Sequence, residues 1–342
     1  MKKIIIPIIL IVFIIGSAII IGRIGTVDAS SNALLDENEV ASIEHFNICL
    51  VPDLSNRLDI EKCPKPIDDS QLVNAIIDEI YPTILKNRVD MNQPDKIFVK
   101  FTSPRIINYY NVNNSVLTFD FEKFENQIDR INYLTNRDDK GKFESDKHAF
   151  KNAFKILLNN ARQRVCGADV WSFFNNEINN TCIRTEVNRI DNKDYILEHK
   201  YKNIIVLFTD GYVEAGLYGP NNMTGNKTYH LSSNLIREFR TKYEQSKETD
   251  IQTFFNKYGY GLVPLNNPIL KDVEVLAVEF YDRSLTPSGN ATVHPTDGEI
   301  LELFWNDWMM MSGVKKFKSC KITSSVDEFM NEFHEFTGIR VR

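Results

Sequence analysis

Two apolar stretches, about 150 residues apart, each end in a short polar turn, and this pairing constrains the fold more than any other feature of the chain. The first runs from Phe46 to Val51 and is followed by Asp53-Leu54-Ser55. The second runs from Asn203 to Phe208 and is followed by Thr209-Asp210-Gly211. Short apolar runs that end in turn residues are typical of buried strands in a parallel sheet. We therefore expect two buried strands that deliver carboxylates and hydroxyls to one edge of a sheet.

The rest of the chain alternates between helical and strand patterns. Leu72, Ile76 and Ile80 recur at helical spacing, whereas the sequence DVEVLAVEFY has the composition of a strand. Mostly alternating elements predict an α/β fold with a doubly wound, mostly parallel sheet and helices on both faces. The expected strands cover residues 45–51, 96–102, 115–121, 203–209, 272–281 and 317–323, and the expected helices cover 67–86, 147–164, 232–245, 250–258, 297–311 and 326–336.

The N-terminus has the pattern of a membrane anchor. Lys2 and Lys3 precede an uncharged apolar stretch from Ile4 to Gly22. Its 19 residues nearly match the roughly 20 that cross a bilayer, whereas the apolar core of a cleaved signal peptide has about 7–15. We expect a signal anchor in residues 1–25, with the lysines in the cytoplasm and the domain in the periplasm or outside the cell. The alternative is cleavage near Val27-Asp28-Ala29, which would release a secreted protein.

The remaining chain is expected to form one domain on a tether. Residues 26–44 are polar and acidic and predict the tether, and residues 45–342 predict a single large domain. Two long connections, at about 164–202 and 212–271, are expected to be insertions in this domain.

Charge and cysteine usage exclude two classes of function. The net charge of −6 and the pI near 5.6 give no basic surface for nucleic acid. The five cysteines show no Cys-x-x-Cys spacing and no histidine cluster, which argues against a zinc site. Cys166 and Cys182 bracket a short segment that a disulfide would close in an oxidising compartment, and Cys63 is a rival partner. The odd number leaves at least one thiol free.

Asp53, Ser55 and Asp210 are the first candidates for a functional site. In open α/β sheets, ligands bind beyond the carboxyl ends of the strands, where the strand order reverses. If the two apolar strands are neighbours at that point, these three side chains converge there. Carboxylate and hydroxyl oxygens suit a hard divalent cation, namely Mg²⁺, or Mn²⁺ or Ca²⁺ in its place. A cation left with an open position accepts a carboxylate from outside, which makes a binding site.

These motifs resemble those of the von Willebrand factor A domain. That family has an Asp-x-Ser-x-Ser loop after its first strand, a Thr before a middle helix and a Thr-Asp-Gly after its fourth strand. Here Asp53-Leu54-Ser55-Asn56-Arg57 is similar to the loop, and IIVLFTDGYVEAG is similar to the fourth strand with Asp210. The resemblance implies a metal-ion-dependent adhesion site, degenerate in this chain, with Asp53, Ser55 and Asp210 as ligands. For the family Thr, Ser145 is the best-placed hydroxyl, with Thr135 behind it.

Arg57 departs from this pattern, because it replaces the second Ser of the loop. Its guanidinium group can take the place of the cation by pairing with the carboxylates of Asp53 and Asp210. The alternative is that Arg57 points to solvent while Asn56 or Asp59 completes the metal site.

Three functional hypotheses follow. The first is a membrane-anchored interaction module that binds an unidentified protein partner through a divalent cation. The second is a metal-independent scaffold that uses the insertions as its contact surface. The third, an enzyme, is a phosphoester hydrolase with Mg²⁺ on Asp53 and Asp210. No motif places a His or Lys as acid, base or phosphate clamp, so we expect a binding protein and no enzyme.

Overall fold

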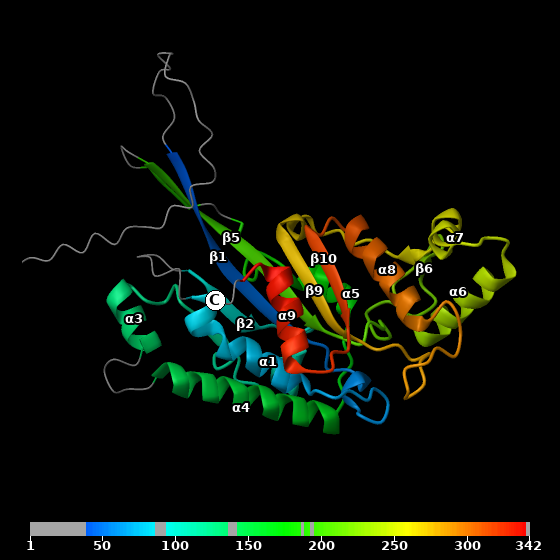
Figure 1. Ribbon diagram of the computed structural model, residues 1–342, viewed down its shortest axis with the longest axis horizontal. Coiled ribbons are helices and arrows are strands. Elements are labelled where there is room, and N and C mark those ends of the chain that lie inside the picture. Colours follow the sequence, from blue (N-terminus) through cyan, green and yellow to red (C-terminus); the bar gives the residue numbers. More distant parts are fainter. Residues whose placement is uncertain (1–38, 86–93, 136–141, 186–187, 192–194, 340–342) are drawn as a thin grey trace, which may run out of the picture.

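The computed structural model describes residues 39–85, 94–135, 142–185, 188–191 and 195–339. A seven-stranded sheet forms the centre of the molecule (Figure 1). Its strands are β1 (Glu39–Pro52), β2 (Lys96–Val99), β3 (Thr118–Asp120), β4 (Asn188–Asp191), β5 (Tyr195–Phe208), β9 (Val273–Phe280) and β10 (Lys316–Lys321).

The sheet is mostly parallel. Its strand order is β10-β9-β5-β1-β2-β3, and β4 pairs with β5. Only β3 and β4 run antiparallel to their neighbours among the described strands of this sheet. The chain leaves β1 toward β3 on one side and returns through β5 to β10 on the other, so the order reverses between β1 and β5. The predicted α/β fold with a mostly parallel sheet is confirmed, and the two motif-bearing strands are neighbours.

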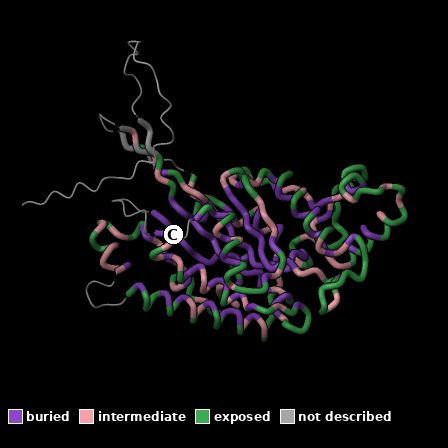
Figure 2. The backbone as a smooth tube through the Cα atoms, viewed as in Figure 1, coloured by how far each residue is buried: buried purple, intermediate pink, exposed green. Residues whose placement is uncertain are grey.

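Helices and apolar cores cover both faces of the sheet, because successive residues of a strand point to opposite faces. On β1, Ile48 and Leu50 belong to one core, and Cys49 and Val51 belong to the other. The first core is closed by α1 (Asp69–Asp78), α4 (Lys142–Gln163) and α9 (Val326–Thr337), with α2 (Arg105–Tyr109) and α3 (Gln127–Thr135) at its margin. The second is closed by α5 (Val170–Ser172), α6 (Ser233–Gln245), α7 (Ile251–Tyr258) and α8 (Asp297–Met311). Figure 2 shows the central strands as the most buried part of the backbone.

Short elements complete the fold. A small second sheet has the order β6-β7-β8, with β6 (Met223–Thr224), β7 (Lys227–Thr228) and β8 (Gly261–Leu262). Short 3₁₀ or π segments occur at η1 (Asn56–Leu58), η2 (Ile80–Ile84), η3 (Phe173–Glu177) and η4 (Pro268–Asp272). The second sheet, α6 and α7 lie within the predicted insertion 212–271, so this connection is an ordered part of the domain.

The N-terminal boundaries differ from those expected. β1 begins at Glu39, where it already pairs with Tyr195 of β5, so the last residues of the predicted tether belong to the sheet. Likewise β5 begins inside the predicted insertion 164–202. The predicted anchor from Ile4 to Gly22 lies outside the described residues. Within the described part of the chain, no helix has the length and apolar character needed to cross a membrane.

The predicted disulfide between Cys166 and Cys182 is wrong, because both are free thiols in the structure. Cys166 is exposed, whereas Cys182 is buried. The backbone carbonyl of Cys182 accepts a hydrogen bond from Nδ2 of Asn47, 2.6 Å away, which holds this end of the segment against β1. Cys63, the rival partner, is also a free and buried thiol.

A buried amide ties this segment to the sheet. Nδ2 of Asn203 donates to the carbonyls of Arg184 (2.8 Å) and Asp272 (3.2 Å). Its Oδ1 accepts from the backbone N–H of Arg184 (2.9 Å) and from Nδ2 of Asn47 (2.8 Å). One buried side chain therefore satisfies polar groups from three separate parts of the chain.

We expect Asn203→Ala to lower the free energy of unfolding by about 3 kcal/mol, because a buried polar group left without a partner costs roughly 1–3 kcal/mol. Urea denaturation monitored by circular dichroism measures this change. Asn222→Ala, in an exposed loop, is the matched control and should change stability by less than about 0.5 kcal/mol. A loss below about 1 kcal/mol at Asn203 would contradict this role of the amide.

Candidate binding site at the carboxyl edge of the sheet

Asp53 and Asp210 meet where β1 and β5 end. The N–H of Asp53 donates to the carbonyl of Phe208 at 3.0 Å, which extends the ladder between the strands by one residue. Both aspartates are almost completely buried, with 1% and 3% of their surface exposed. The structure therefore brings together the two carboxylates that the sequence singled out.

The side chain of Asp53 is held by two protein donors. The N–H of Ser55 donates to Oδ1 at 2.9 Å, and the hydroxyl of Thr209 donates to Oδ2 at 3.1 Å. Ser55 caps η1, where its Oγ lies 3.5 Å from the N–H of Arg57. Ser55 thus lies at the expected edge, and each carboxylate oxygen of Asp53 already has a hydrogen-bond donor.

Burial raises the pKa of both carboxylates and so makes them harder to ionise. Burial raises the pKa of Asp53, against the opposing effects of Arg57 and of the hydrogen bonds from Ser55 and Thr209. Burial, together with the nearby charge of Asp53, raises the pKa of Asp210 to about 6, although Arg283 and Arg57 act in the opposite direction. The ionised forms of Asp53 and Asp210 therefore depend on the cations nearby for their stabilisation.

Arg57 is the first of these cations, and it points inward. It is 3% exposed. Its Nε donates to the backbone carbonyl of Asp53 at 2.9 Å, and both of its terminal nitrogens face the carboxylate of Asp69. Of the two placements considered for Arg57, the structure shows the one in which its guanidinium group lies beside Asp53. Its carboxylate partner, however, is Asp69 and not the pair Asp53 and Asp210, and the alternative of a solvent-facing Arg57 is wrong.

Asp69 was missed as a site residue, because its sequence context is that of a helix start. It is the first residue of α1, whose N-cap Asp68 forms a capping box with Gln71. Burial favours the neutral acid, but Arg57 and Lys65 together hold the pKa of Asp69 well below its usual range. Asp69 is thus the negatively charged partner of Arg57, and the pair fixes the loop after β1 to the start of α1.

Arg283 is the second cation, and no motif in the sequence indicates it. Its Nη2 pairs with Oδ2 of Asp210 at 2.9 Å, and its Nη1 pairs with Glu214 at 3.0 Å. Nη1 also donates to the hydroxyl of Ser233 at 2.6 Å, and the guanidinium group stacks over the ring of Tyr212 at 3.6 Å. Its side chain is 33% exposed, so Arg283 covers the solvent side of Asp210.

A fourth acid, Glu279, extends the cluster on the side of Lys65. The ammonium group of Lys65 pairs with Asp69 and lies 3.5 Å from Oε2 of Glu279. Glu279 is 2% exposed and has φ of 75°, a conformation that is uncommon outside glycine. Burial raises its pKa to about 6, with Lys65 opposing and Asp69 adding to the shift.

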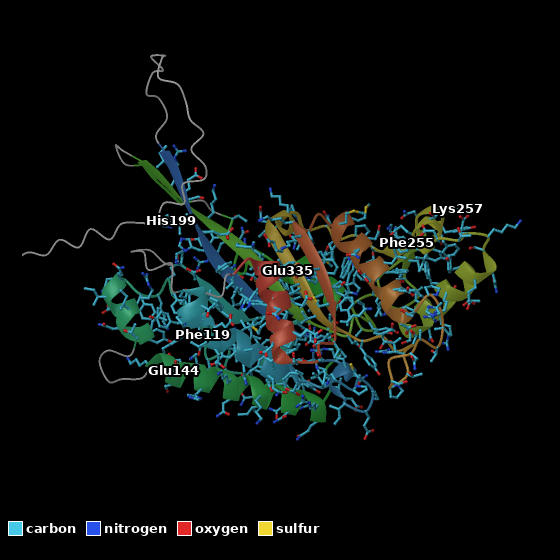
Figure 3. All side chains as sticks on the ribbon, in the orientation of Figure 1. Phe119, Glu144, His199, Phe255, Lys257 and Glu335 are labelled. Atoms are coloured by element: carbon cyan, nitrogen blue, oxygen red, sulfur yellow. The ribbon has the colours of Figure 1, made fainter. Side chains whose placement is uncertain are left out.

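Ser145 does not belong to this site. The helix that it was expected to cap begins earlier, at Lys142, so Ser145 lies within the first turn of α4 and is exposed. Its neighbour Asp146 accepts a hydrogen bond from the hydroxyl of Tyr133 on α3, and Figure 3 shows Glu144 at the α3 end of α4. Thr135, the second choice, donates its hydroxyl to the carbonyl of Ile131 within α3.

The residues at the edge do not fit a bound divalent cation. Both oxygens of Asp53 accept protein hydrogen bonds, Asp210 pairs with Arg283, and Arg57 replaces the second Ser of the loop. No group of three or more His, Cys, Asp or Glu side chains in the described residues is arranged to hold a metal ion. Fixed guanidinium groups supply the positive charge that such a site obtains from a metal.

We expect Arg57→Met to lower the free energy of unfolding by about 3–5 kcal/mol, because it removes one partner of a buried ion pair. Arg57→Lys should recover only part of this loss, since an ammonium group cannot donate to the Asp53 carbonyl and bridge the Asp69 carboxylate at the same time. Chemical denaturation checks both values. Arg105→Met, at an exposed position, is the control and should leave the free energy of unfolding nearly unchanged. If Arg57→Lys recovered the full stability of the wild type, the double contact of Arg57 with the Asp53 carbonyl and the Asp69 carboxylate would not be what stabilises the fold.

From the raised pKa of Glu279 we predict that the folded protein becomes less stable as the pH rises. Its raised pKa means that the folded protein keeps a proton up to about pH 6, whereas the unfolded chain releases it near pH 4.5. The proton bound to Glu279 contributes fully to the free energy of unfolding below the unfolded pKa, and this contribution is lost as the pH rises through 6. The loss amounts to about 2 kcal/mol. In Glu279→Gln this contribution should disappear, so its unfolding free energy should fall less between pH 4.5 and 7 than that of the wild type. Identical pH profiles would contradict the assignment.

No model of a known protein family matches the sequence. No curated protein matches it either.

Proposed function

We propose that this chain is a protein-binding module of the von Willebrand factor A type, in which buried and half-buried arginines replace the divalent cation of the adhesion site. The strand order supports this proposal. Numbered along the chain without β4, the strands lie in the order 3-2-1-4-5-6, which is that of doubly wound sheets that bind ligands where the order reverses. Asp53, Ser55 and Asp210 follow the two strands at that point.

The observation that carries the proposal is the inward position of Arg57. A metal-dependent site needs acceptors that are free to coordinate, whereas here the guanidinium group fixes Asp69 and the Asp53 carbonyl from within. Arg283 closes the outer side by pairing with Asp210. The cation-bridged module and the phosphoester hydrolase both require a divalent ion on Asp53 and Asp210, so both are less well supported than a metal-independent module.

The contact surface of such a module would lie around the same edge. Glu214, whose side chain is 45% exposed, and Arg283 present opposite charges beside the buried aspartates. Glu214 lies near the start of the ordered insertion 212–271, which adds α6 and α7 beside the sheet, and Arg283 follows the insertion. Binding residues concentrate in loops and insertions that a rigid scaffold positions. As part of this proposal, the apolar stretch from Ile4 to Gly22 anchors the module in a membrane and displays this surface outside the cytoplasm.

The proposal predicts a partner contact at the edge that does not depend on metal. A photo-crosslinking amino acid at position 214 should yield a protein adduct in source cells, in equal amounts in EDTA and in Mg²⁺. The same amino acid at Lys155, an exposed position on α4, is the control and should not yield this adduct.

The proposal also predicts that metal ions do not stabilise the protein. The melting temperature of the full chain should be the same in EDTA and in Mg²⁺, Mn²⁺ or Ca²⁺, because only a ligand that binds the folded state raises it. An adduct or a melting shift that requires the cation would restore the metal-bridged mechanism, and the absence of any adduct would count against a binding surface at this edge.

A further inference from the structure

Glu279 lies in a bulge near the carboxyl end of β9, where this strand runs beside β10 (Figure 1). Ser319 of β10 pairs with Ala277. Lys321, two residues later, pairs with Phe280, so β9 has one residue more than its neighbour over this stretch. Ala277 and Phe280 therefore face the same core although three residues separate them. At the bulge Glu279 has φ of 75°, which is strained for a residue with a side chain.

Neither charge state of Glu279 is well accommodated at this position. Its carboxylate oxygens are buried and form no hydrogen bond with the described residues. Nζ of Lys65 lies 3.5 Å from Oε2, but this ammonium group is already paired with Asp69. A neutral Glu279 thus lacks a hydrogen-bond partner, and an ionised Glu279 must share its cation with another carboxylate.

Charged and titratable groups face Glu279 from the loop after β1 and from the start of α1. These groups are Arg57, Cys63, Lys65 and Asp69. Burial raises the pKa of the Cys63 thiol to about 12, so this group stays neutral near pH 6. On β10, Lys321 is exposed. The two cations do not offset the burial of Glu279 and the charge of Asp69, because its pKa is raised to about 6.

A groove beside Glu279 gives the side chain a place to move. The groove has a volume of about 600 Å³ and is lined by Lys65 and by Phe280, Tyr281 and Asp282, which follow Glu279 in the chain. A change of φ at Glu279 to the negative range relieves the backbone strain. The same change takes the carboxylate out of its buried position. Strained residues of this kind are concentrated at switch regions.

We propose that Glu279 is a pH-operated switch, which stays in the bulge when its carboxyl group is neutral and moves out into the groove when this group is ionised. The segment that follows shifts with it. In the buried form the N–H of Tyr281 donates to the carbonyl of Asp210 at 3.1 Å, and Arg283 pairs with the Asp210 carboxylate at 2.9 Å. The switch therefore acts on the outer closure of the arginine site. The switch stands without the proposed function, and only its effect on partner binding rests on that proposal.

Proton linkage sets the direction and the size of the response. The pKa of Glu279 is about 6 in the buried position, against an ordinary value of 4.5 for a glutamate in water. A rising pH therefore favours the released form, and the ratio of released to buried molecules increases by at most about 30-fold. The strain and the missing hydrogen bonds destabilise the buried form, so that a shift of this size changes the major form.

Trp305 is a natural reporter of this segment. Its ring centroid lies 5.4 Å from that of Phe280, and its Nε1 donates to the carbonyl of Gly211 at 2.8 Å. The chain has three tryptophans, so 5-fluorotryptophan labelling gives three signals in a ¹⁹F NMR spectrum. Trp305→Phe assigns the reporter signal. Trp171, on α5, is the internal control.

The experiment follows the labelled full chain in detergent micelles from about pH 4 to about pH 8. We expect the Trp305 signal to move to a second position between about pH 4.5 and 6.5, while the Trp171 signal stays in place. Glu279→Gln, which cannot ionise, should keep the acidic position at every pH. Glu279→Gly should do the same, because glycine adopts the positive φ without strain. Glu302→Gln, at an exposed position on the same helix as Trp305, is the matched control and should respond as the wild type does.

Two results would overturn the switch. One is a Trp305 signal that does not change with pH in the wild type. The other is a pH response that persists in both Glu279 variants. That response would belong to Asp210, which precedes Gly211 and whose pKa is also about 6. The measurement needs no partner and no metal, so its outcome is independent of the crosslinking experiment.

Discussion

The buried ion pair between Arg57 and Asp69 is the interaction on which the carboxyl edge of the sheet depends. A guanidinium group with 3% of its surface exposed has lost nearly all contact with water, and only good geometry compensates for that loss. Here the planar fork faces the Asp69 carboxylate while Nε reaches the Asp53 carbonyl. The pair therefore connects the end of β1 to the first residue of α1. It fixes the loop between them, and with it the position of the Asp53 side chain.

Charge balance explains why so many acids are tolerated at this edge. Asp53, Asp69, Asp210 and Glu279 are buried together, and Arg57, Lys65 and Arg283 are the cations that contact them. Four acids against three bases leave one excess negative charge when all are ionised. Burial, together with the nearby charges of Asp53 and Asp69 respectively, raises the pKa of Asp210 and of Glu279 to about 6, so these two acids take up a proton more readily than an ordinary carboxylate. Arg57, Lys65 and Arg283 offset most of the negative charge that a divalent cation would otherwise offset.

The parts of the fold that follow from local pattern were predictable from the sequence. The apolar runs that form β1 and β5, and the motifs that end them, indicated a shared sheet edge because parallel strands end on the same side. The start of β1 was misplaced, since Glu39, Ser42 and Glu44 interrupt the apolar pattern of this segment, which pairs with β5. Ser145 was misplaced for a related reason. A hydroxyl before a helical pattern predicts a cap, but α4 extends one turn further toward its N-terminus.

The partners of the two aspartates were predictable only in part. Arg57 was visible because it interrupts a motif, but its pairing with Asp69 depends on the angle between the loop and α1, which no local pattern encodes. Arg283 and Glu279 lie at or just beyond the end of β9 and carry no motif, and their roles arise from the packing of distant segments. The cysteine prediction failed because spacing along the chain says nothing of which side of the fold a thiol reaches. Cys166 is at the surface, and Cys182 is buried over β1.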